Sequence, residues 1–397
     1  MFRRPLRAAW TWLRVFMNGR EKEAMRCHRR QRIYQVHFAT PAFLGGADQS
    51  ALWRIPPFKA LIRQWWRIVW WRSQQRPSIE ALRDQESLWF GSSAENETGA
   101  SRFRLRLDDW RGKTLNQMEF QKIGFGKVDH EEVGKKVSAS LYLGYGPVTW
   151  QSGKAQLQRA SALPVSDSRT LILAYPNGLD AAVEATMRLI GLFGCLGGRS
   201  RNGWGSLMIQ EVDQQGDSRP LFDEAVLNES DQRARDWLRP WAVPWKDALD
   251  QDWCHALGRD EKGLLLWRTE LKNRWENVLE QFAKVKIGMR TQFHFKGGGP
   301  HASLCDRQIL AYPVTNHSLH AWGNKARSAN QLLFKVLAVS DGFLGIIVHL
   351  PHSLPEPLKA ALGQGPLENI RQREEKVWSK MHQYLDDVSK SSLVRLK

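Results

Sequence analysis

Five glycines and two arginines lie together between residues 194 and 207 (GCLGGRSRNGWGSL), and this composition suits the binding of an anion. Glycine lets a ligand approach the main chain, and exposed backbone N–H groups can cradle phosphate oxygens. Arginine adds charge-assisted, bidentate hydrogen bonds to phosphate. The alternative is a helix C-cap followed by an irregular turn, which glycines alone would also explain. The residues predicted to contact phosphate are Gly197, Gly198, Arg199, Ser200, Arg201, Asn202, Gly203, Trp204 and Gly205.

Two regular elements are expected to position this loop. Apolar residues recur at helical spacing over residues 181–193, and residues 206–212 read as a short strand. The loop therefore joins a helix to a strand. A dinucleotide-binding fingerprint requires the opposite order, and the GxxxxGK(S/T) pattern of a P-loop does not occur in the sequence.

A second basic segment is predicted to be a helix over residues 56–73, because two prolines open it and apolar residues recur at helical spacing. Lys59, Arg63 and Arg67 recur every fourth residue, and Trp66 adjoins them. Cations and aromatic rings on one face are typical of surfaces that bind single-stranded RNA. The alternative is a charged helix face that is simply solvated. The absence of acidic residues between the basic ones argues against this alternative.

The hydropathy pattern predicts an α+β fold. Strands are expected at residues 32–39, 101–107, 170–175 and 206–212, with one helix after the first and one after the third. This order is the βαββαβ arrangement of ferredoxin-like and RRM folds. Residues 108–137 contain lysines and glycines and read as an insertion, for which the sequence suggests a mobile loop. In the second half, the sequence predicts a helix near 263–282 and a hairpin around Ser340-Asp341-Gly342.

The glycine-rich loop resembles that of the RAMP superfamily, the RRM-like proteins of CRISPR systems. Residues 40–48 (TPAFLGGAD) and 56–67 (PPFKALIRQWWR) are similar to the opening of one family within it, the first RAMP subunit of type III-B CRISPR effector (Cmr) complexes. Ala60 stands where that pattern usually has glycine. Together with a third, weaker segment, the resemblance covers roughly residues 30–350.

That third segment is residues 323–336, which are similar to the second half of such subunits. It contains Lys325 and Arg327, which we predict to contact RNA phosphates. Asn330-Gln331 replaces the usual Ser-Pro, which weakens the similarity at this point.

The resemblance implies an α+β chain with two ferredoxin-like (RRM-like, βαββαβ) RAMP domains with insertions, to which the sequence pattern adds an N-terminal basic helix and a C-terminal charged helix. The expected boundaries are a basic amphipathic arm at 1–30, a first RAMP domain at 31–212, a linker at 213–233, a second RAMP domain at 234–356 and a helical tail at 357–397. It also implies a non-catalytic subunit that caps the crRNA-bearing filament and helps to capture target RNA in antiviral defence. The expected partners are crRNA, target single-stranded RNA and other RAMP subunits.

Composition agrees with a nucleic-acid partner. The chain has 397 residues and a formal net charge of +17, so its field attracts polyanions. An anionic membrane is the rival partner, but no apolar run is long enough to span a bilayer. Four dispersed cysteines without a CxxC pair suggest neither disulfides nor a metal site, and we expect no cofactor and a cytoplasmic protein.

Two other functions stay open at this stage. A metal-independent crRNA-processing RAMP endoribonuclease would use His37 or His28 as a general base. The mid-chain position of the glycine loop argues against it, because the resemblance places the corresponding loop of those nucleases near the C-terminus. A stand-alone RRM-like RNA-binding protein would be expected to carry an RNP1 strand, which the sequence lacks.

Overall fold

The computed structural model describes residues 29–75, 77–92, 99–158, 160–363 and 369–397. The basic arm expected at residues 1–30 therefore lies almost wholly outside the described residues. Helices and strands alternate along the rest of the chain, which gives the mixed α+β architecture that the sequence predicts. Within the described ranges, no helix is both long and apolar enough to cross a bilayer.

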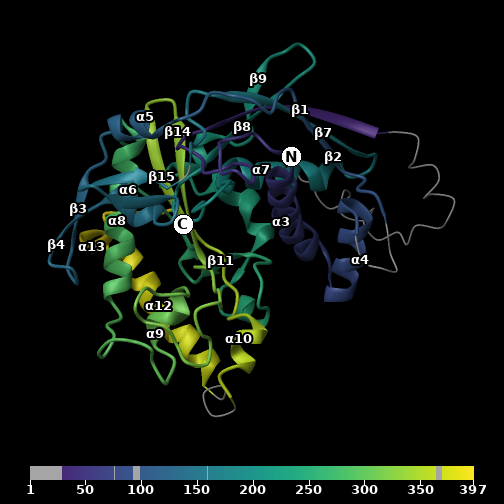
Figure 1. Cartoon of the computed structure of the whole chain (residues 1–397). Helices are drawn as coiled ribbons and strands as arrows, with labels where there is room; N and C mark the ends of the chain where they lie inside the picture. The colour runs from purple at the N-terminus through teal and green to yellow at the C-terminus, as the bar shows by residue number, and fades with distance from the viewer. Residues whose placement is uncertain (1–28, 76, 93–98, 159, 364–368) are drawn as a thin grey trace.

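The first sheet has the strand order β2-β7-β1-β8-β9, and every neighbouring pair is antiparallel (Figure 1). Tyr34, Val36 and Phe38 of β1 are buried, because alternate side chains of a strand face the same side of the sheet. The strands are β1 (Arg29–Phe38), β2 (Arg104–Leu107), β7 (Ser168–Pro176), β8 (Leu207–Val212) and β9 (Ser218–Pro220).

Two helices cover the inner face of this sheet. α3 (Ile55–Ser73) follows β1, and α7 (Asp180–Phe193) follows β7. α3 has proline in its first turn, where the missing backbone N–H would have no helical partner. The two helices pack against each other and share one apolar core with the sheet. The strand-helix-strand-strand-helix-strand order thus places α7 so that its C-terminal end leads directly into the glycine loop and β8.

Between β2 and β7 the chain forms an insertion with its own regular elements. Asn116 and Glu119 form a capping box at the start of its first helix, and two hairpins follow. The sequence suggested a loop over 108–137, but local capping and pairing give ordered structure there. The elements are α5 (Gln117–Lys122), β3 (Lys127–His130), β4 (Lys135–Ser138), α6 (Ala139–Gly144), β5 (Val148–Gln151) and β6 (Lys154–Leu157).

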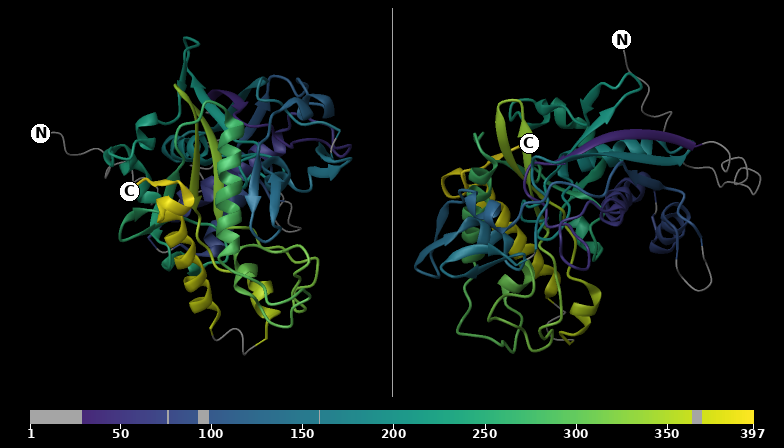
Figure 2. Two further views of the ribbon diagram at one scale, coloured as in Figure 1. Left: turned by 90° about the vertical axis from the view of Figure 1, so that its left-hand side faces the viewer. Right: turned by 45° about the horizontal axis from the view of Figure 1, so that its top comes forward.

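The second sheet repeats the chain order of the first, with strands arranged β14-β15-β13-β16 and all neighbours antiparallel. Its helices α8 and α12 lie side by side, as the left view of Figure 2 shows. The elements are β13 (Leu266–Arg268), α8 (Trp275–Thr291), β14 (Leu332–Val339), β15 (Gly342–His349), α12 (Ile370–Asp386) and β16 (Val394–Arg395).

The expected boundary at residue 356 differs from this arrangement. The sequence analysis treats residues 357–397 as a charged helical tail, yet they supply α12 and β16. β16 pairs with β13, and α12 buries Val377, Trp378 and Met381. Charged residues dominate the composition of α12, which is why the sequence reads as a tail. One face of the helix is apolar and buried, so this segment completes the second unit.

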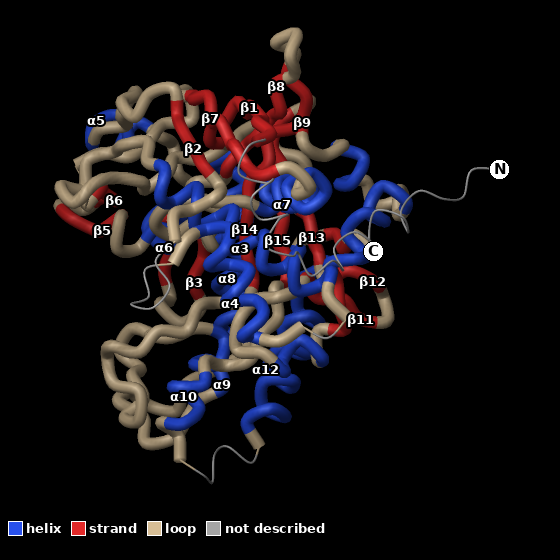
Figure 3. The backbone as a smooth tube through the Cα atoms, turned by 90° about the vertical axis from the view of Figure 1, so that its right-hand side faces the viewer, coloured by secondary structure: helices blue, strands red, loops and turns tan. Residues whose placement is uncertain are grey.

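The second sheet is buried on both faces, which explains its nearly continuous apolar strands. Leu333 and Leu337 of β14 belong to the core around α3 and α7, whereas Leu332, Phe334 and Val336 belong to the core around α8 and α12. Figure 3 shows β14, β15 and β13 below the first sheet, with α7 between the two sheets. The molecule is therefore layered as sheet, helices, sheet, helices.

Shorter elements connect the two units. The segment expected as a linker at 213–233 contains β9, which pairs with β8, and the buried side chains of Val226 and Leu227. A small sheet of order β10-β11-β12 lies beyond it. These and the remaining elements are α4 (Ile79–Phe90), η2 (Glu224–Leu227), η3 (Arg233–Trp241), β10 (Ala242–Pro244), η4 (Asp247–Asp250), β11 (Leu257–Asp260), β12 (Gly263–Leu264), α9 (Asp306–Leu310), α10 (Glu356–Ala360) and α13 (Val388–Ser391).

Candidate nucleic-acid interface

The backbone of the glycine loop, residues 194–207, packs closely against neighbouring backbone of the same protein. Gly205 has φ 60°, and a Cβ atom there would lie 1.9 Å from the backbone oxygen of Leu196. Gly197 has φ 92°, and a Cβ atom there would lie 2.8 Å from the backbone oxygen of Phe43. Both positions combine left-handed backbone with close backbone contact, so only glycine fits them. These glycines serve close packing within the protein.

The second half of the loop is enclosed. Asn202, Gly203, Trp204 and Gly205 are all buried, although the sequence predicts that they contact RNA. The Trp204 ring is 0% exposed and packs against Phe43 with 4.8 Å between ring centroids. Its other aromatic neighbours are Phe120, Phe125 and Trp275. In this conformation Trp204 is a core residue where the two units and the insertion meet, and it offers no face to a base.

Arg201 links the loop to the second unit. Its Nη1 donates to the backbone oxygen of Asn330 at 2.5 Å, and its own carbonyl accepts from the N–H of Phe334 at 3.2 Å. Next to this bridge, Ser206 Oγ accepts from the N–H of Val336 at 2.9 Å. Burial lowers the pKa of Arg201 from its ordinary value. The glycine loop is thus the joint between β8 and β14, and Arg201 is part of that joint.

The first half of the loop faces outward and carries one exposed cation. Gly197, Gly198 and Ser200 are partly exposed, and Arg199 is exposed with φ 58°. A Cβ atom at Gly146 would lie 3.4 Å from Arg199 Nη2, so the guanidinium lies beside the turn after α6. Arg199 is therefore the residue through which this loop can meet a ligand.

Two cations from α8 join Arg199. Lys286 Nζ donates to Asn202 Oδ1 at 2.5 Å, while Asn202 Nδ2 donates to the backbone oxygen of Leu143 at 2.8 Å. Arg290, one helical turn further along α8, donates from Nη1 to the hydroxyl of Tyr142 at 3.4 Å. We call Arg199, Lys286 and Arg290 the glycine-loop cation cluster.

The electrostatics of this cluster favour an anionic partner. Burial lowers the pKa of Lys286 to about 7, and the charges of Arg290 and Arg199 add to the effect. Desolvation also lowers the pKa of Arg199. Across the described ranges, none of the three forms an ion pair with a carboxylate. Like charges that face one another without compensation are stabilised by a phosphate placed between them.

The basic stripe of α3 has a different environment. Arg63 and Arg67 both contact the carboxylate of Glu86 on α4, with Arg67 Nη2 at 2.7 Å from Glu86 Oε1. Their charges are thereby partly compensated, and Lys59 is half-buried on the same helix. Sequence inspection finds no acid within this stripe, because the acid comes from the next helix. Their role in RNA binding stays a prediction.

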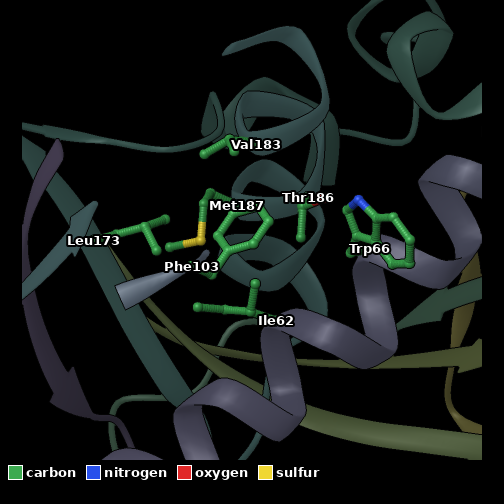
Figure 4. A pocket seen from close by; sticks show the side chains of 7 residues that line it. All are labelled: Ile62, Trp66, Phe103, Leu173, Val183, Thr186 and Met187. Carbon is green, nitrogen blue, oxygen red and sulfur yellow. The ribbon is translucent and has the colours of Figure 1, made fainter. Parts of the chain in front are cut away.

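Trp66 on α3 is in the core rather than on the surface, with 2% of its side chain exposed. It lines an apolar cavity that leaves no room for a water molecule. Figure 4 shows it beside Thr186 of α7, with Met187 across the cavity and Ile62 below. Burial on this scale prevents Trp66 from stacking on a base in the described conformation.

Lys325 and Arg327 lie on the exposed segment that precedes β14. Arg327 Nη1 donates to the backbone oxygens of Asn324 and Ala326, each at 2.7 Å. Both side chains are open to solvent, and the strand that follows them meets the glycine loop at Phe334. A direct link between these two residues and the cation cluster is not observed in the described part of the chain.

Comparison with protein families adds an independent observation. Residues 36–208 match the RAMP superfamily model, a span that runs from β1 through α3, the insertion and the glycine loop into β8. This part of the chain is similar to the RAMP superfamily. Comparison with curated proteins finds no match.

Several solved structures are similar to this chain. One is the crystal structure of Cmr1 from Pyrococcus furiosus in its apo form, with 15% identity, a TM-score of 0.39, and coverage of 82% of this chain and 90% of that one. Another is a chain of the cryo-EM structure of the type III-B Cmr-β complex bound to cognate target RNA, with 12% identity, a TM-score of 0.40, and coverage of 89% and 100%. A third is a chain of a type IV-B CRISPR complex, with 10% identity, a TM-score of 0.26, and coverage of 47% and 91%.

Sequence reasoning found the RAMP glycine loop but missed two members of the cation cluster. Lys286 and Arg290 lie four residues apart in α8, the spacing that puts two side chains on one helix face. That spacing was the available signal. It gave no reason to pair α8 with a loop more than eighty residues earlier, because only the fold brings the two segments together.

Proposed function

We propose that this protein is a non-catalytic, RNA-binding RAMP subunit of a type III-B CRISPR effector complex. Support comes from the RAMP model match and from the similarity of residues 40–48 and 56–67 to the first RAMP subunit of such complexes. In this role it caps the crRNA-bearing filament in the cytoplasm, contacts other RAMP subunits and helps to capture target RNA.

The fold supports the proposal in a second way. The order β2-β7-β1-β8 in the first sheet and the order β14-β15-β13-β16 in the second each follow from a βαββαβ chain path. We therefore interpret the two units as two ferredoxin-like RAMP domains. On this interpretation the second domain runs through β16, and the glycine loop of the first domain contacts β14 of the second.

The observation that carries RNA binding is the glycine-loop cation cluster. Arg199, Lys286 and Arg290 converge without a carboxylate partner among the described residues. A bound phosphate would favour the charged form of Lys286 and form charge-assisted hydrogen bonds, each of which contributes about 1.5–3 kcal/mol. Tyr145, 60% exposed in the adjacent turn, supplies a ring on which a base can stack.

The test is equilibrium binding of the full chain to a fluorescent single-stranded RNA of mixed sequence. Arg199→Gln and Lys286→Met should each weaken binding about tenfold at low salt, since each removes one charged contact. Arg219→Gln removes an exposed arginine on β9 and is the matched control for loss of one charge. Weakening in the cluster variants that does not exceed the control would refute the assignment.

The non-catalytic part of the proposal has its own test. His37, the general base of the nuclease alternative, lies on β1 opposite Ser168 and Met208, and burial lowers its pKa. His28 lies outside the described residues. We expect the full chain to leave labelled crRNA precursor intact in the absence of metal. Site-specific cleavage that disappears in His37→Ala would instead establish the processing nuclease.

Association with a complex separates this proposal from a stand-alone RNA-binding protein. A tagged chain should co-purify with neighbouring RAMP subunits and crRNA when they are co-expressed. Retention of RNA binding with no association to any RAMP subunit would favour the stand-alone alternative.

A further inference from the structure

A pocket of about 390 Å³ lies where the C-terminal end of α3 meets η4 and β11. This volume falls within the range of small-molecule sites and can hold one nucleotide. None of its residues belongs to the glycine-loop cation cluster or to the α3 stripe. They are Trp71, Arg72, Ala242, Val243, Pro244, Asp247, Asp250, Gln251, His255 and Arg259.

Two arginines line this pocket, which also contains Asp247 and Asp250. Arg72 Nε is buried and has no hydrogen-bond partner among the described residues. Arg259 is the charged group that acts on the pKa of Arg72. Within the described residues, neither guanidinium takes part in an ion pair. Desolvation, followed by the charge of Arg259, lowers the pKa of Arg72 from its ordinary value. A buried N–H without a hydrogen-bond partner and two guanidinium groups lining one pocket both favour an oxyanion ligand.

The other walls suit the rest of a nucleotide. His255 is buried, and its ring packs edge-on against Trp71 with 5.8 Å between centroids, which gives the pocket an apolar, aromatic side. Asp247 and Asp250 are exposed, and Asp250 Oδ1 accepts from Arg371 Nη1 at 2.9 Å. Carboxylates accept hydrogen bonds from ribose hydroxyls and base amino groups but repel a continuous phosphate backbone. The mixture favours one phosphorylated unit over an extended strand.

We propose that this pocket binds a single nucleotide by its phosphate, with Arg72 and Arg259 donating to the phosphate oxygens. The nucleotide is either a free mononucleotide or the phosphorylated end of an RNA strand, and the recognising chemistry is the same for both. The proposal goes beyond the RNA-binding function and uses different residues, so either can fail without the other.

The test is isothermal titration of the full chain with adenosine 5′-monophosphate, adenosine and inorganic phosphate. We expect adenosine monophosphate to bind, adenosine to bind at least tenfold more weakly, and phosphate to compete. Arg259→Gln, at an exposed position, and Arg72→Gln should each weaken binding about tenfold or more, because each removes a charged contact. Arg219→Gln, which removes an exposed arginine of β9, is the matched control and should bind the mononucleotide as the wild type does.

A second arm identifies the source of the phosphate. A decaribonucleotide with a 5′-phosphate is compared with the same strand ending in a 5′-hydroxyl. If the protein prefers the phosphorylated strand and Arg259→Gln abolishes this preference, the site binds an RNA end. If the two strands bind equally, the site binds a free nucleotide. The proposal is overturned if the wild type binds neither adenosine monophosphate nor phosphate. It is equally overturned if adenosine binds as well as its monophosphate, or if both arginine variants, folded by circular dichroism, bind unchanged.

Discussion

Lys335 offers a sharp test of the joint between the two units, because it is a buried cation with no acidic partner among the described residues. It is 0% exposed on β14, and its Nζ donates to the backbone oxygens of Gly191 at 2.6 Å and Ile190 at 3.3 Å. These carbonyls end α7, where a helix favours positive charge. Burial nevertheless lowers the pKa of Lys335 from 10.5 to about 7.

The sign of the pH effect follows from this shift. Between the folded and unfolded pKa values, the unfolded chain binds one more proton than the folded chain, so stability rises with pH. Integrating a folded-state pKa of about 7 from pH 6 to pH 8.5 gives roughly 2 kcal/mol of added stability. Cys195 is adjacent, but burial raises its pKa to about 11, so it stays a neutral thiol over this range.

Lys335→Met removes the titrating group and keeps similar volume. We compare the free energies of unfolding of the two proteins in urea from pH 6 to pH 8.5. The difference between them removes the contribution of every other titrating group, because both proteins share those groups. The free energy of unfolding of the wild type should rise relative to that of the variant by roughly 2 kcal/mol over this interval. A difference that stays constant with pH would refute the reasoning, because Lys335 would then titrate in the folded protein above this range.

Two further predictions concern packing. Glu86→Gln should lower the free energy of unfolding by about 1–3 kcal/mol, because Arg63 and Arg67 lose their shared carboxylate, and urea denaturation measures it. Gly205→Ala should lower the melting temperature more than Gly216→Ala, because both positions have positive φ but only at Gly205 would the Cβ atom meet backbone. Equal melting temperatures for the two glycine variants would show that the glycine loop relaxes around the added methyl group.

The sequence predicted the structure best where the spacing of nearby residues decides which side chains are buried. The alternation of Phe103, Leu105 and Leu107 with arginines predicts a strand with one buried and one basic face. In the structure, Phe103 just before β2 and Leu107 at its end are buried, while Arg104 and Arg106 are exposed. The hairpin around Asp341-Gly342 also forms, since a tight turn joins two apolar runs.

Prediction failed where a distant segment decides the environment. Residues 263–282 read as one helix, but residues 266–268 pair with β15 and β16, and the helix begins at Trp275. Three residues are too few to show a strand period, so only their partners reveal the strand. In the same way, the glycine loop reads as exposed, and its second half is buried only because β14 and α8 pack onto it.

The central claim is that RNA meets the protein at the glycine-loop cation cluster. The most direct measurement is photocrosslinking of the full chain to single-stranded RNA containing 4-thiouridine, with the linked peptides mapped by mass spectrometry. The account predicts crosslinks at residues 142–146, 197–201 and 286–290, which lose intensity in Arg199→Gln but not in Arg219→Gln. Crosslinks confined to α3 around Lys59, Arg63 and Arg67, with none at the cluster, would contradict it.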